Sequence, residues 1–468
     1  MSKRNDVAKF GGTSLAELLQ FLKVISIILA NPSYLYIVVS APGKRFDGDT
    51  KVTDHLYALA SADTSESQKD AILLELERRF RAISHGLGLP KDFLDTEFQI
   101  IRERVREIRA GKNEHVPWLI SRGEHLSALI LAKKLGFLFL DAAKVLIFDK
   151  HGRINMEKSK KSLDTLNPKG LPSVIGGFHG SSEEDGQVVL MPRGGSDLTA
   201  AYITALTNAN TCAIYSDTPM RAADPRIVPG AKIIREISFR EVRELTSNGA
   251  QILHPDVTRV LKGAGKQILL LDTNHPDDAG TLVIPDGQAR KRKSRRVVGV
   301  SVQRFFSIYT IVDAGMNEKT GYLLDVLSVF KRRGINFQHT PSGVDEQCVV
   351  VRTSELCGEA EAILEEIRSV CNPENITVEH DMTLVRVVGD GMAQTIGIAG
   401  RVGIALALAG INIHVIDQGA SERAMTFGVR DIYAVRAVQF IYKGFFGRSI
   451  LRLLLSDPTL RVLSKLVA

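Results

Sequence analysis

The segment DVAKFGGTS, residues 6–14, decides the fold. Residues 6–10 are typical of a buried strand, and two glycines follow it directly. Ser14 stands three residues before Glu17, a pattern that predicts a capping box and a helix beginning just after Ser14. Two glycines between a strand and a helix let backbone N–H groups face an anion, and Lys9 adds positive charge beside them. The segment favours a phosphate-binding turn, although many turns of this kind hold no ligand.

Outward from this turn, residues 1–285 alternate short apolar strands with helices, which predicts a mostly parallel α/β sheet. We expect further strands at residues 34–40, 171–178, 211–217 and 267–273. Spacings of four and three residues predict one apolar helical face made of Leu94, Phe98, Ile101, Val105 and Ile108. Ser238 and Glu241 repeat the capping-box pattern. No GxxxxGKS/T or GxGxxG motif occurs, so P-loop and dinucleotide-binding folds are not expected.

Two more glycine-containing segments stand before predicted helices. Residues 193–197 (RGGSD) follow a hairpin-like stretch and open a helix at 198–206, and residues 121–124 (SRGE) precede a helix that ends at Gly136. Each segment has a plain explanation, because an N-cap residue or an acid in a first turn needs no ligand. Three such segments at strand-to-helix junctions of one sheet nevertheless favour a ligand crevice along the strand ends.

The composition is that of a globular protein with two or three domains. The 468 residues are too many for one core, and 44 % of them are hydrophobic and 24 % charged. No apolar run reaches the ~18 residues of a membrane span, and the N-terminus lacks the apolar core of a secretory signal. The four cysteines form no CxxC pair, so we expect neither disulfides nor a protein-bound metal. These features favour a reduced, cytoplasmic compartment.

Two segments stand outside the predicted domains. Six of the seven residues 290–296 (RKRKSRR) are basic and account for most of the net charge of +7. We expect a solvated linker at residues 286–297, and a contact with nucleic acid is the less favoured alternative. Residues 447–468 are apolar with interspersed arginines, which predicts a tail helix packed on the body or, alternatively, one lying on a membrane surface.

After the linker the chain repeats itself with an offset of 76 residues. Residues 315–316 (GM) recur at 391–392, and residues 334–336 (GIN) recur at 410–412. Each copy is predicted to form a strand, a glycine turn, an amphipathic helix and a second strand. The repeat predicts two small domains, at residues 298–375 and 376–446.

The motifs of the chain occur in the order seen in aspartokinases. They are KFGGTS, SRGE, GGF, RGGSDLTA, ADPRIV, the LHP of residues 253–255 and the NxxxxxGT of residues 274–281. The repeated unit resembles the tandem ACT domains of that family, especially in GINI and in residues 418–422 (QGASE). The resemblance covers the chain between Val7 and Phe446. It implies an amino-acid-kinase domain, an open and mostly parallel sheet sandwiched by helices, followed by two α+β ACT-like domains of βαββαβ topology.

The resemblance also implies the site residues. It makes Lys9 and Asp197 the catalytic pair, with Lys9 facing the transferred phosphoryl group. Substrate contacts are implied for Thr53, Glu124, Arg193, Gly194 and Ser196. Within this set, Glu124 takes the ammonium group and Arg193 the α-carboxylate. Nucleotide contacts are implied for Lys9, Gly11, Gly12, Ser40, Ser216, Asp217 and Arg226.

The implied reaction is ATP-dependent phosphorylation of the L-aspartate side chain, the first step of lysine, threonine and methionine biosynthesis. This carboxylate has a pKa of about 3.9 and is ionised at pH 7, so no general base is required. Positioning and charge neutralisation by Lys9, backbone N–H groups and a Mg²⁺ carried by ATP would accelerate the transfer.

Two segments depart from the family pattern. Gln251 stands where many aspartokinases have a lysine that reaches the nucleotide phosphates. Residues 216–221 (SDTPMR) lack the glycine and the aromatic residue often found in the nucleotide loop, and Arg221 is a candidate for the missing positive charge. Both departures concern the nucleotide site.

Paired ACT domains imply control by a small molecule. We expect a homo-oligomer formed through these domains and inhibited by an aspartate-derived amino acid, with lysine favoured over threonine. The pocket is expected at Met316, Gly321, Asp325, Thr340, Pro341 and Ser342. Asp325 would take the effector's ammonium group, and the alternative is that it is a solvated helix residue.

Two other functions stay open at this point. A glutamate or acetylglutamate kinase would share the fold, but such enzymes generally lack paired ACT-like units. A non-catalytic amino-acid sensor is disfavoured by the intact Lys9, Glu124, Arg193 and Asp197 and slightly favoured by Gln251. A fusion with homoserine dehydrogenase is not expected, given the chain's length and the missing dinucleotide motif.

Overall fold

The computed structural model describes residues 5–192, 194–216, 219–246, 253–286 and 296–447. These residues fall into two units. Unit 1 comprises Met1–Met220 and Ile252–Pro285, and unit 2 comprises Arg221–Gln251 and Asp286–Ala468. Within the part of the chain that the structure describes, no helix has both the length and the apolar character that a membrane span needs. The predicted tail and most of the basic run lie outside the described residues.

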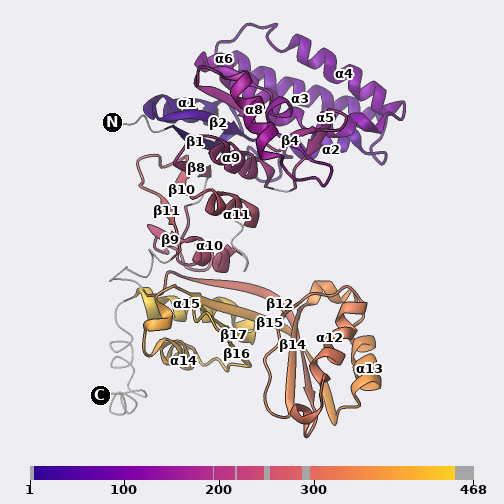
Figure 1. Ribbon diagram of the computed structural model, residues 1–468, viewed down its shortest axis with the longest axis vertical. Coiled ribbons are helices and arrows are strands. Elements are labelled where there is room, and N and C mark those ends of the chain that lie inside the picture. Colours follow the sequence, from indigo (N-terminus) through magenta and orange to yellow (C-terminus); the bar gives the residue numbers. More distant parts are fainter. Residues whose placement is uncertain (1–4, 193, 217–218, 247–252, 287–295, 448–468) are drawn as a thin grey trace. The chain divides into compact units, whose positions relative to one another are not determined.

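Unit 1 is built on a mostly parallel sheet, as predicted (Figure 1). Its strands lie in the order β3 (Leu138–Leu140), β5 (Ser173–Gly176), β2 (Tyr34–Val39), β1 (Asp6–Phe10), β8 (Thr211–Ser216), β10 (Gln267–Asp272) and β11 (Thr281–Ile284). β11 is antiparallel to β10, and the pairs from β3 to β10 are parallel. The strand at residues 171–178 is shorter than predicted. The Leu171 N–H bonds to the side chain of Asn167 at its start, and Phe178 has a φ of 76° at its end.

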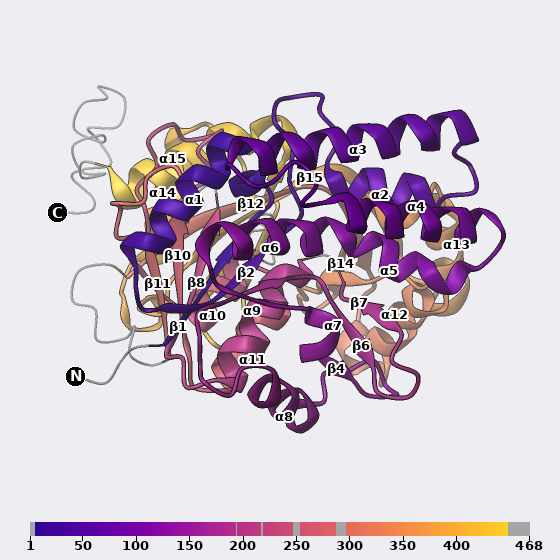
Figure 2. The same ribbon diagram turned by 90° about the horizontal axis from the view of Figure 1, so that it is seen from above.

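Helices cover both faces of this sheet (Figure 2). One face is covered by α1 (Leu18–Ala30), α2 (Val52–Ala60), α3 (Glu66–Gly86), α4 (Asp95–Arg109), α5 (Val116–Ile120) and α6 (Arg122–Leu135). The other face carries α9 (Gly195–Leu206), with α8 (Met156–Leu166) and α11 (Pro255–Gly263) beside it. The predicted apolar face of α4 is confirmed, since its five residues are all buried. Alternate strand residues such as Phe10, Ile37 and Val39 join the core beneath α1, α3 and α6.

A small second sheet includes the chain segment that connects β5 to α9. It contains β4 (Ile147–Phe148), β6 (His179–Ser182) and β7 (Val188–Leu190), and α7 (Ala142–Val145) packs on it. β6 and β7 are antiparallel, which confirms the predicted hairpin. The hairpin therefore delivers the RGGSD segment to the start of α9.

One predicted capping box is correct and the other is wrong. The Glu241 N–H donates to Ser238 Oγ at 3.1 Å and the Ser238 N–H donates to Glu241 Oε2 at 2.8 Å, and α10 (Phe239–Thr246) begins directly after Ser238. Ser14 instead lies inside a single 3₁₀ turn, η1 (Thr13–Leu15), and its hydroxyl bonds to Thr273 Oγ1 at 2.7 Å. Because Thr273, directly after β10, occupies that hydroxyl, α1 begins only at Leu18.

Unit 2 contains an antiparallel six-stranded sheet (Figure 1). The order is β13 (Phe337–His339), β14 (Glu346–Arg352), β12 (Gly299–Val312), β15 (Asn375–Val388), β17 (Ala424–Arg430) and β16 (Val415–Gln418). α12 (Tyr322–Arg332) and α13 (Ala360–Cys371) belong to the first repeat, and α14 (Ile398–Leu408) and α15 (Ala434–Phe446) to the second. The short elements of unit 2 are β9 (Glu236–Ser238), η4 (Met316–Glu318), η5 (Thr353–Leu356), η6 (Met392–Gln394) and η7 (Asp431–Tyr433), and η2 (Asn113–His115) belongs to unit 1.

The two predicted α+β repeats are confirmed, and they share their central strands. Residues 306–312 of β12 pair with β14 and with the first half of β15, whereas residues 299–303 of β12 pair with the second half of β15. Residues 382–388 of β15 then pair with β17. Gly321 and Gly397, equivalent positions of the repeat, both have a φ of 83° before their helices, a conformation that favours glycine. The exact domain limits given above stay a prediction.

Candidate active site

The carboxyl ends of five parallel strands meet at one edge of the sheet in unit 1. Lys9 lies near the end of β1, Ser216 ends β8, and Ser40, Gly177 and Thr273 follow within one residue of the ends of β2, β5 and β10. Ligands of open α/β sheets bind along this edge. Lys9, Ser40 and Ser216, which the sequence singled out, therefore lie at the expected edge of the sheet.

Lys9 and Asp197 form an ion pair at this edge, with 2.6 Å between Lys9 Nζ and Asp197 Oδ1. Their side chains are 10 % and 16 % exposed, so both charges are largely removed from water. Asp197 lies in the first turn of α9, where its N–H donates to the Gly194 carbonyl at 3.0 Å. Gly194 has a φ of 86°, which lets the chain turn sharply into the helix. The structure thus joins the two residues predicted to be catalytic.

The glycine turn, residues 11–16, packs backbone to backbone against the segment after β2. The Gly43 N–H donates to the Gly12 carbonyl at 2.8 Å, and a Cβ on Gly43 would lie 2.7 Å from the Gly12 carbonyl carbon. A Cβ on Gly12 would lie 2.9 Å from the Ala41 carbonyl oxygen. The Gly11 N–H donates to the Tyr215 carbonyl at 3.2 Å, so that N–H serves the fold. Close approach of two backbones explains why glycines stand at positions 12 and 43.

Glu124 is a buried carboxylate that lacks a partner on one oxygen. It lies in the first turn of α6 and is 3 % exposed, and its Oε2 has no hydrogen-bond partner among the described residues. Burial raises its pKa to about 8, against backbone hydrogen bonds and the charges of Arg122 and Lys9, which lower it. A buried oxygen without a partner is unfavourable, so the position suits a cationic ligand group.

The expectation that Glu124 follows a strand-to-helix junction is wrong. Its segment, residues 121–124, spans the junction of α5 and α6, and the Ser121 hydroxyl donates to the Trp118 carbonyl at 2.7 Å. The Ser121 N–H also donates to the Pro117 carbonyl, so one helix runs almost directly into the next. Glu124 reaches the site because α6 packs on β5 and β2, with Gly176 against its backbone.

Phe178 and Gly177 hold the segment after β5 against the start of α9. A Cβ on Gly177 would lie 2.6 Å from Ser196 Cβ. Phe178 has a φ of 76°, uncommon for a residue with a side chain, and its N–H donates to Thr199 Oγ1 at 3.1 Å. Phe178 belongs to the GGF motif, but the sequence predicted no role for it. Only the two preceding glycines signalled a close approach there.

The remaining predicted residues of unit 1 occupy nearby elements. Thr53 lies in the first turn of α2, and Ser40 donates its N–H to the Phe10 carbonyl at 3.1 Å; both residues are half-buried. Ser216, also half-buried, ends β8. Arg193, Asp217 and Gln251 lie outside the described residues.

Arg226 and Arg221, the nucleotide-site candidates of the loop after β8, belong to unit 2. The Arg226 side chain is 87 % exposed and pairs with Asp224 at 2.7 Å. Arg221 donates to the Ala231 carbonyl at 2.7 Å. Within unit 2 both guanidinium groups already have protein partners.

The predicted effector residues lie in the first repeat. Met316 is buried in η4, Gly321 caps α12, and Asp325 is exposed in the first turn of that helix. The effector residues after β13, Thr340, Pro341 and Ser342, precede β14, and the Cys348 N–H donates to the Pro341 carbonyl at 2.8 Å.

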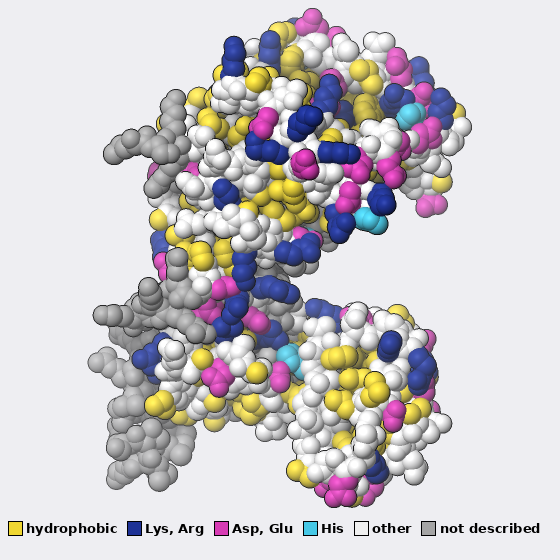
Figure 3. All heavy atoms as spheres, in the orientation of Figure 1, with side chains coloured by type: hydrophobic (Ala, Val, Ile, Leu, Met, Phe, Trp, Pro, Cys, Tyr) yellow, Lys and Arg dark blue, Asp and Glu magenta, His cyan; other side chains and the backbone are white. Residues whose placement is uncertain are grey.

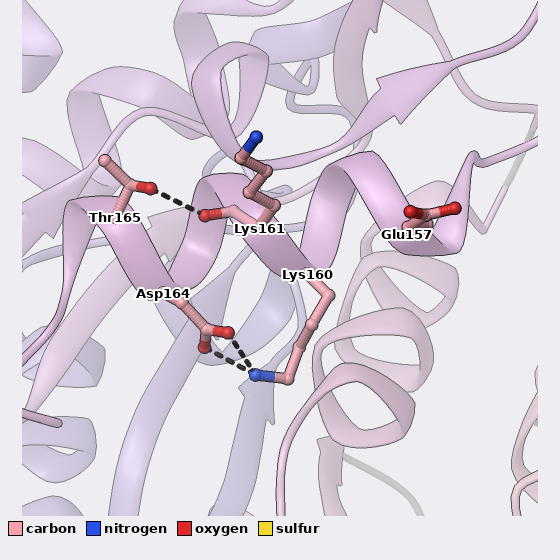
Figure 4. A pocket seen from close by; sticks show the side chains of 5 residues that line it. All are labelled: Glu157, Lys160, Lys161, Asp164 and Thr165. Carbon is pink, nitrogen blue, oxygen red and sulfur yellow. Dashed lines mark hydrogen bonds and ion pairs between the residues drawn. The ribbon is translucent and has the colours of Figure 1, made fainter.

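A shallow pocket on α8 offers no comparable chemistry (Figure 4). It is lined by Glu157, Lys160, Lys161, Asp164 and Thr165, all from one helix. Lys160 pairs with Asp164, and the Thr165 hydroxyl donates to the Lys161 carbonyl at 2.8 Å. Among the residues that the structure describes, no cluster of three or more His, Cys, Asp or Glu side chains could hold a metal ion.

Comparison with known proteins relates the chain to the kinases of amino acids. The chain matches the amino acid kinase family over residues 7–272 and an ACT domain over residues 385–445. A crystal structure of aspartate kinase from Clostridium acetobutylicum resembles the chain with a TM-score of 0.84 and 36 % identity, covering 94 % of this chain and 100 % of that chain.

Two curated relatives match over similar lengths. Aspartokinase 3 of Bacillus subtilis is 28 % identical over 94 % of this chain and 98 % of its own length. Lysine-sensitive aspartokinase 3 of Escherichia coli is 27 % identical over 94 % of this chain and 99 % of its own length. The similarity therefore spans both the unit that carries the site and the repeated domains.

Proposed function

Because the chain belongs to the amino acid kinase family and, within it, to the aspartate kinases, we propose the reaction that it catalyses. It transfers the γ-phosphoryl group of ATP to the side-chain carboxylate of L-aspartate and forms 4-phospho-L-aspartate. This acyl phosphate is the starting point for lysine, threonine and methionine. The enzyme works in the cytoplasm, in line with its cysteine usage.

The observation that carries the proposal is the unpartnered Oε2 of Glu124, buried at the same sheet edge as the Lys9–Asp197 pair. An amino-acid substrate supplies the ammonium group that this carboxylate lacks. Arg193 takes the α-carboxylate as a bidentate partner, and Thr53, Gly194 and Ser196 complete the substrate contacts. These contacts fix the amino acid at its α-carbon and leave the side-chain carboxylate to face the phosphoryl donor.

The transfer needs charge neutralisation more than proton transfer. The attacking carboxylate is anionic at pH 7, and so is the γ-phosphate. Lys9, held in place by Asp197, faces the transferred group and stabilises negative charge that spreads over it as the bond to ATP breaks. Gly11, Gly12 and Ser40 line the phosphate path, with Ser216, Asp217 and Arg226 on the nucleotide. The Mg²⁺ enters with ATP as part of the substrate.

A hydroxamate-trapping assay tests this function. Hydroxylamine converts an acyl phosphate into a stable hydroxamate, so the protein is incubated with MgATP and either aspartate, glutamate or N-acetylglutamate. We expect hydroxamate with aspartate alone, in an amount equal to the ADP formed. Hydroxamate from glutamate or N-acetylglutamate, or ATP consumption without hydroxamate, would contradict the assignment.

We further propose that the repeated domains regulate this activity in a homo-oligomer. Two ACT-like halves and a lysine-sensitive relative support an amino-acid effector, with lysine favoured over threonine. Figure 3 shows hydrophobic side chains exposed over the α12 region of unit 2. The exposed apolar residues of this region include Leu323, Leu324 and Phe337, which are 41 %, 69 % and 47 % exposed. Association of two chains through this surface would cover them. Sedimentation velocity with and without lysine measures the assembly directly.

A further inference from the structure

Arg79 is a buried arginine whose guanidinium faces the backbone of the active-site loops. It lies on α3 and is 5 % exposed. Its Nη2 donates to the Ala16 carbonyl at 2.8 Å and to the Gly43 carbonyl, and its Nη1 lies 3.4 Å from the Thr50 carbonyl oxygen. Burial, together with the nearby Arg45, lowers its pKa. A buried cation is unfavourable unless such acceptors surround it.

The three carbonyls belong to two segments that form the phosphate path. Ala16 ends the glycine turn, residues 11–16, and the other two lie in the β2–α2 loop, residues 40–51. The loop begins at Ser40 and leads directly to Thr53, and it touches the glycine turn where Gly43 meets Gly12. One side chain from a separate helix therefore bonds both segments beside their contact.

Asp49 closes the β2–α2 loop on itself beneath this arginine. Its carboxylate accepts hydrogen bonds from the Arg45 N–H and from the Arg45 guanidinium at 2.9 Å, and Arg79 Nη1 lies 3.8 Å from it. The bonds from Arg45 hold the Asp49 pKa well below its usual range. Arg45 also reaches Glu75, one turn before Arg79 on α3, at 3.2 Å. α3 thus contacts the loop through Glu75 and Arg79. Together with Arg45 and Asp49 of the loop, these side chains carry two positive and two negative formal charges.

We propose that Arg79 is a positioning residue for phosphoryl transfer, an inference that rests on the proposed function. It touches neither substrate nor reacting atoms. It fixes the β2–α2 loop against the glycine turn, so that Gly12 and Ser40 stay at the separation that the ATP phosphates require. A planar guanidinium can donate to the three carbonyls at once. The lysine side chain is shorter and ends in a single ammonium group, which cannot reach all three.

The test compares Arg79→Lys, Arg79→Ala and the control Arg102→Ala in the full chain. Arg102 is a matched arginine, because it joins α4 to Glu77 of α3 but is 42 % exposed. We expect kcat to fall by about tenfold or more and the KM for MgATP to rise similarly in both Arg79 variants. The KM for aspartate should change by less than about threefold, since Glu124 and Arg193 hold that substrate from other elements. The control should match wild type.

Two further measurements separate positioning from general stability. Guanidinium ion added at millimolar concentration should restore part of the kcat of Arg79→Ala, because it can refill the space between the carbonyls. Trypsin should cut Arg79→Ala faster than wild type at Lys44, Arg45 and Lys51, which are exposed in the β2–α2 loop, and guanidinium should slow that cleavage.

Unchanged kcat and MgATP KM in both Arg79 variants would overturn the proposal. Equal rises in the KM for aspartate and the KM for MgATP would also overturn it. A third contrary outcome is an Arg79→Ala protein that melts at a lower temperature but whose β2–α2 loop is cleaved no faster than in wild type. The proteolysis readout does not depend on catalysis. A wild type that makes no hydroxamate would therefore refute the proposed function and leave the loop measurement interpretable.

Discussion

Lys9 Nζ and Asp197 Oδ1 lie 2.6 Å apart, although one lies near the end of a strand and the other in the first turn of a helix far along the chain. The pair holds the lysine at the helix start, where the phosphoryl group is expected. We predict that Lys9→Met lowers kcat by about two orders of magnitude or more, with only a modest loss of ATP binding. Steady-state kinetics and ATP titration measure the two effects. Lys23→Met, which removes a surface lysine bonded to Asn274, is the control. A Lys9 variant with near-normal kcat would remove the lysine from the mechanism.

The raised pKa of Glu124 predicts the sign of the pH dependence of the reaction. Burial raises its pKa to about 8 in the unliganded site, and the ionised form is needed to take an ammonium group. We expect kcat/KM for aspartate to rise with pH and level off above about 8. Glu124→Gln should flatten this profile and raise the KM for aspartate, whereas Glu114→Gln, at an exposed position, should do neither.

The same group makes a stability prediction. The folded protein holds a proton on Glu124 up to a pKa of about 8, and the unfolded chain releases it near the ordinary value of 4.5. The contribution of Glu124 to the free energy of unfolding therefore decreases as pH rises from 4.5 to 8. Glu124→Gln should lose less thermal stability than wild type over that range. Saturating aspartate should reduce the difference between them, because its ammonium group neutralises the carboxylate.

Arg193 is predicted to bind the α-carboxylate of the substrate. Arg193→Lys keeps the charge but loses the planar fork, so the KM for aspartate should rise by about tenfold or more. The KM for MgATP should stay close to the wild-type value. Equal changes in both constants, or none, would show that the arginine does not bind the α-carboxylate.

His339 links the two halves of unit 2 and should make that unit sensitive to acid. Its Nδ1 lies 2.5 Å from Asp417 Oδ2, and Arg386 Nη2 donates to its Nε2 at 2.9 Å. Burial and the Arg386 charge lower the pKa of His339, against the charges of Asp417 and Glu244, which raise it. Its folded-state pKa lies below the unfolded value of 6.5, so the stability it contributes is present above pH 6.5 and is lost as pH falls below that value.

Thermal melting of wild type and His339→Gln between pH 5 and 8 measures this dependence. We expect the melting temperatures to converge at low pH, where protonated His339 faces the Arg386 guanidinium. The control is His414→Gln, a histidine that lies 3.5 Å from Glu379. A constant difference between wild type and His339→Gln at every pH would contradict the prediction.

Effector binding is tested at Asp325, exposed in the first turn of α12. Because Asp325 is proposed to hold the ammonium group of the effector, Asp325→Ala should relieve inhibition by lysine and leave the uninhibited kcat nearly unchanged. Ordinary allosteric coupling between two sites amounts to about 1–3 kcal/mol. Titrations with lysine, threonine and methionine, singly and in pairs, identify the effector. Inhibition that persists in the variant would assign Asp325 to the solvated helix surface.

Local patterns predicted the strands and the repeat well, because strand periodicity and glycine turns depend on neighbouring residues. The ends of β1, β2, β8 and β10 lie within one residue of their predicted positions. The patterns failed where a partner far along the chain decides the outcome. Ser14 looked like a helix cap, but Thr273 of the β10 end occupies its hydroxyl.

The candidate site could be predicted only in part, because partners far along the chain also decide its contacts. Motif residues such as Lys9 and Glu124 could be named from the sequence, but their supporting contacts could not. Arg79 stands among other charged residues of a helix, and its sequence context does not distinguish it from the exposed Arg78 beside it. Burial against three backbone carbonyls depends on tertiary packing, which no local pattern records.

The shared strands β12 and β15 determine how unit 2 can be cut. A fragment that ended at residue 375 would keep α12, α13 and β14 but lose nearly all of the strand that pairs with β12 on its other side. Residues 299–303, whose ladder partner is the second half of β15, would lose that partner and become an open edge. Such edges recruit strands from other molecules. The first repeat alone should therefore aggregate. The two repeats can diverge in sequence during evolution, but they cannot be separated into two independent domains.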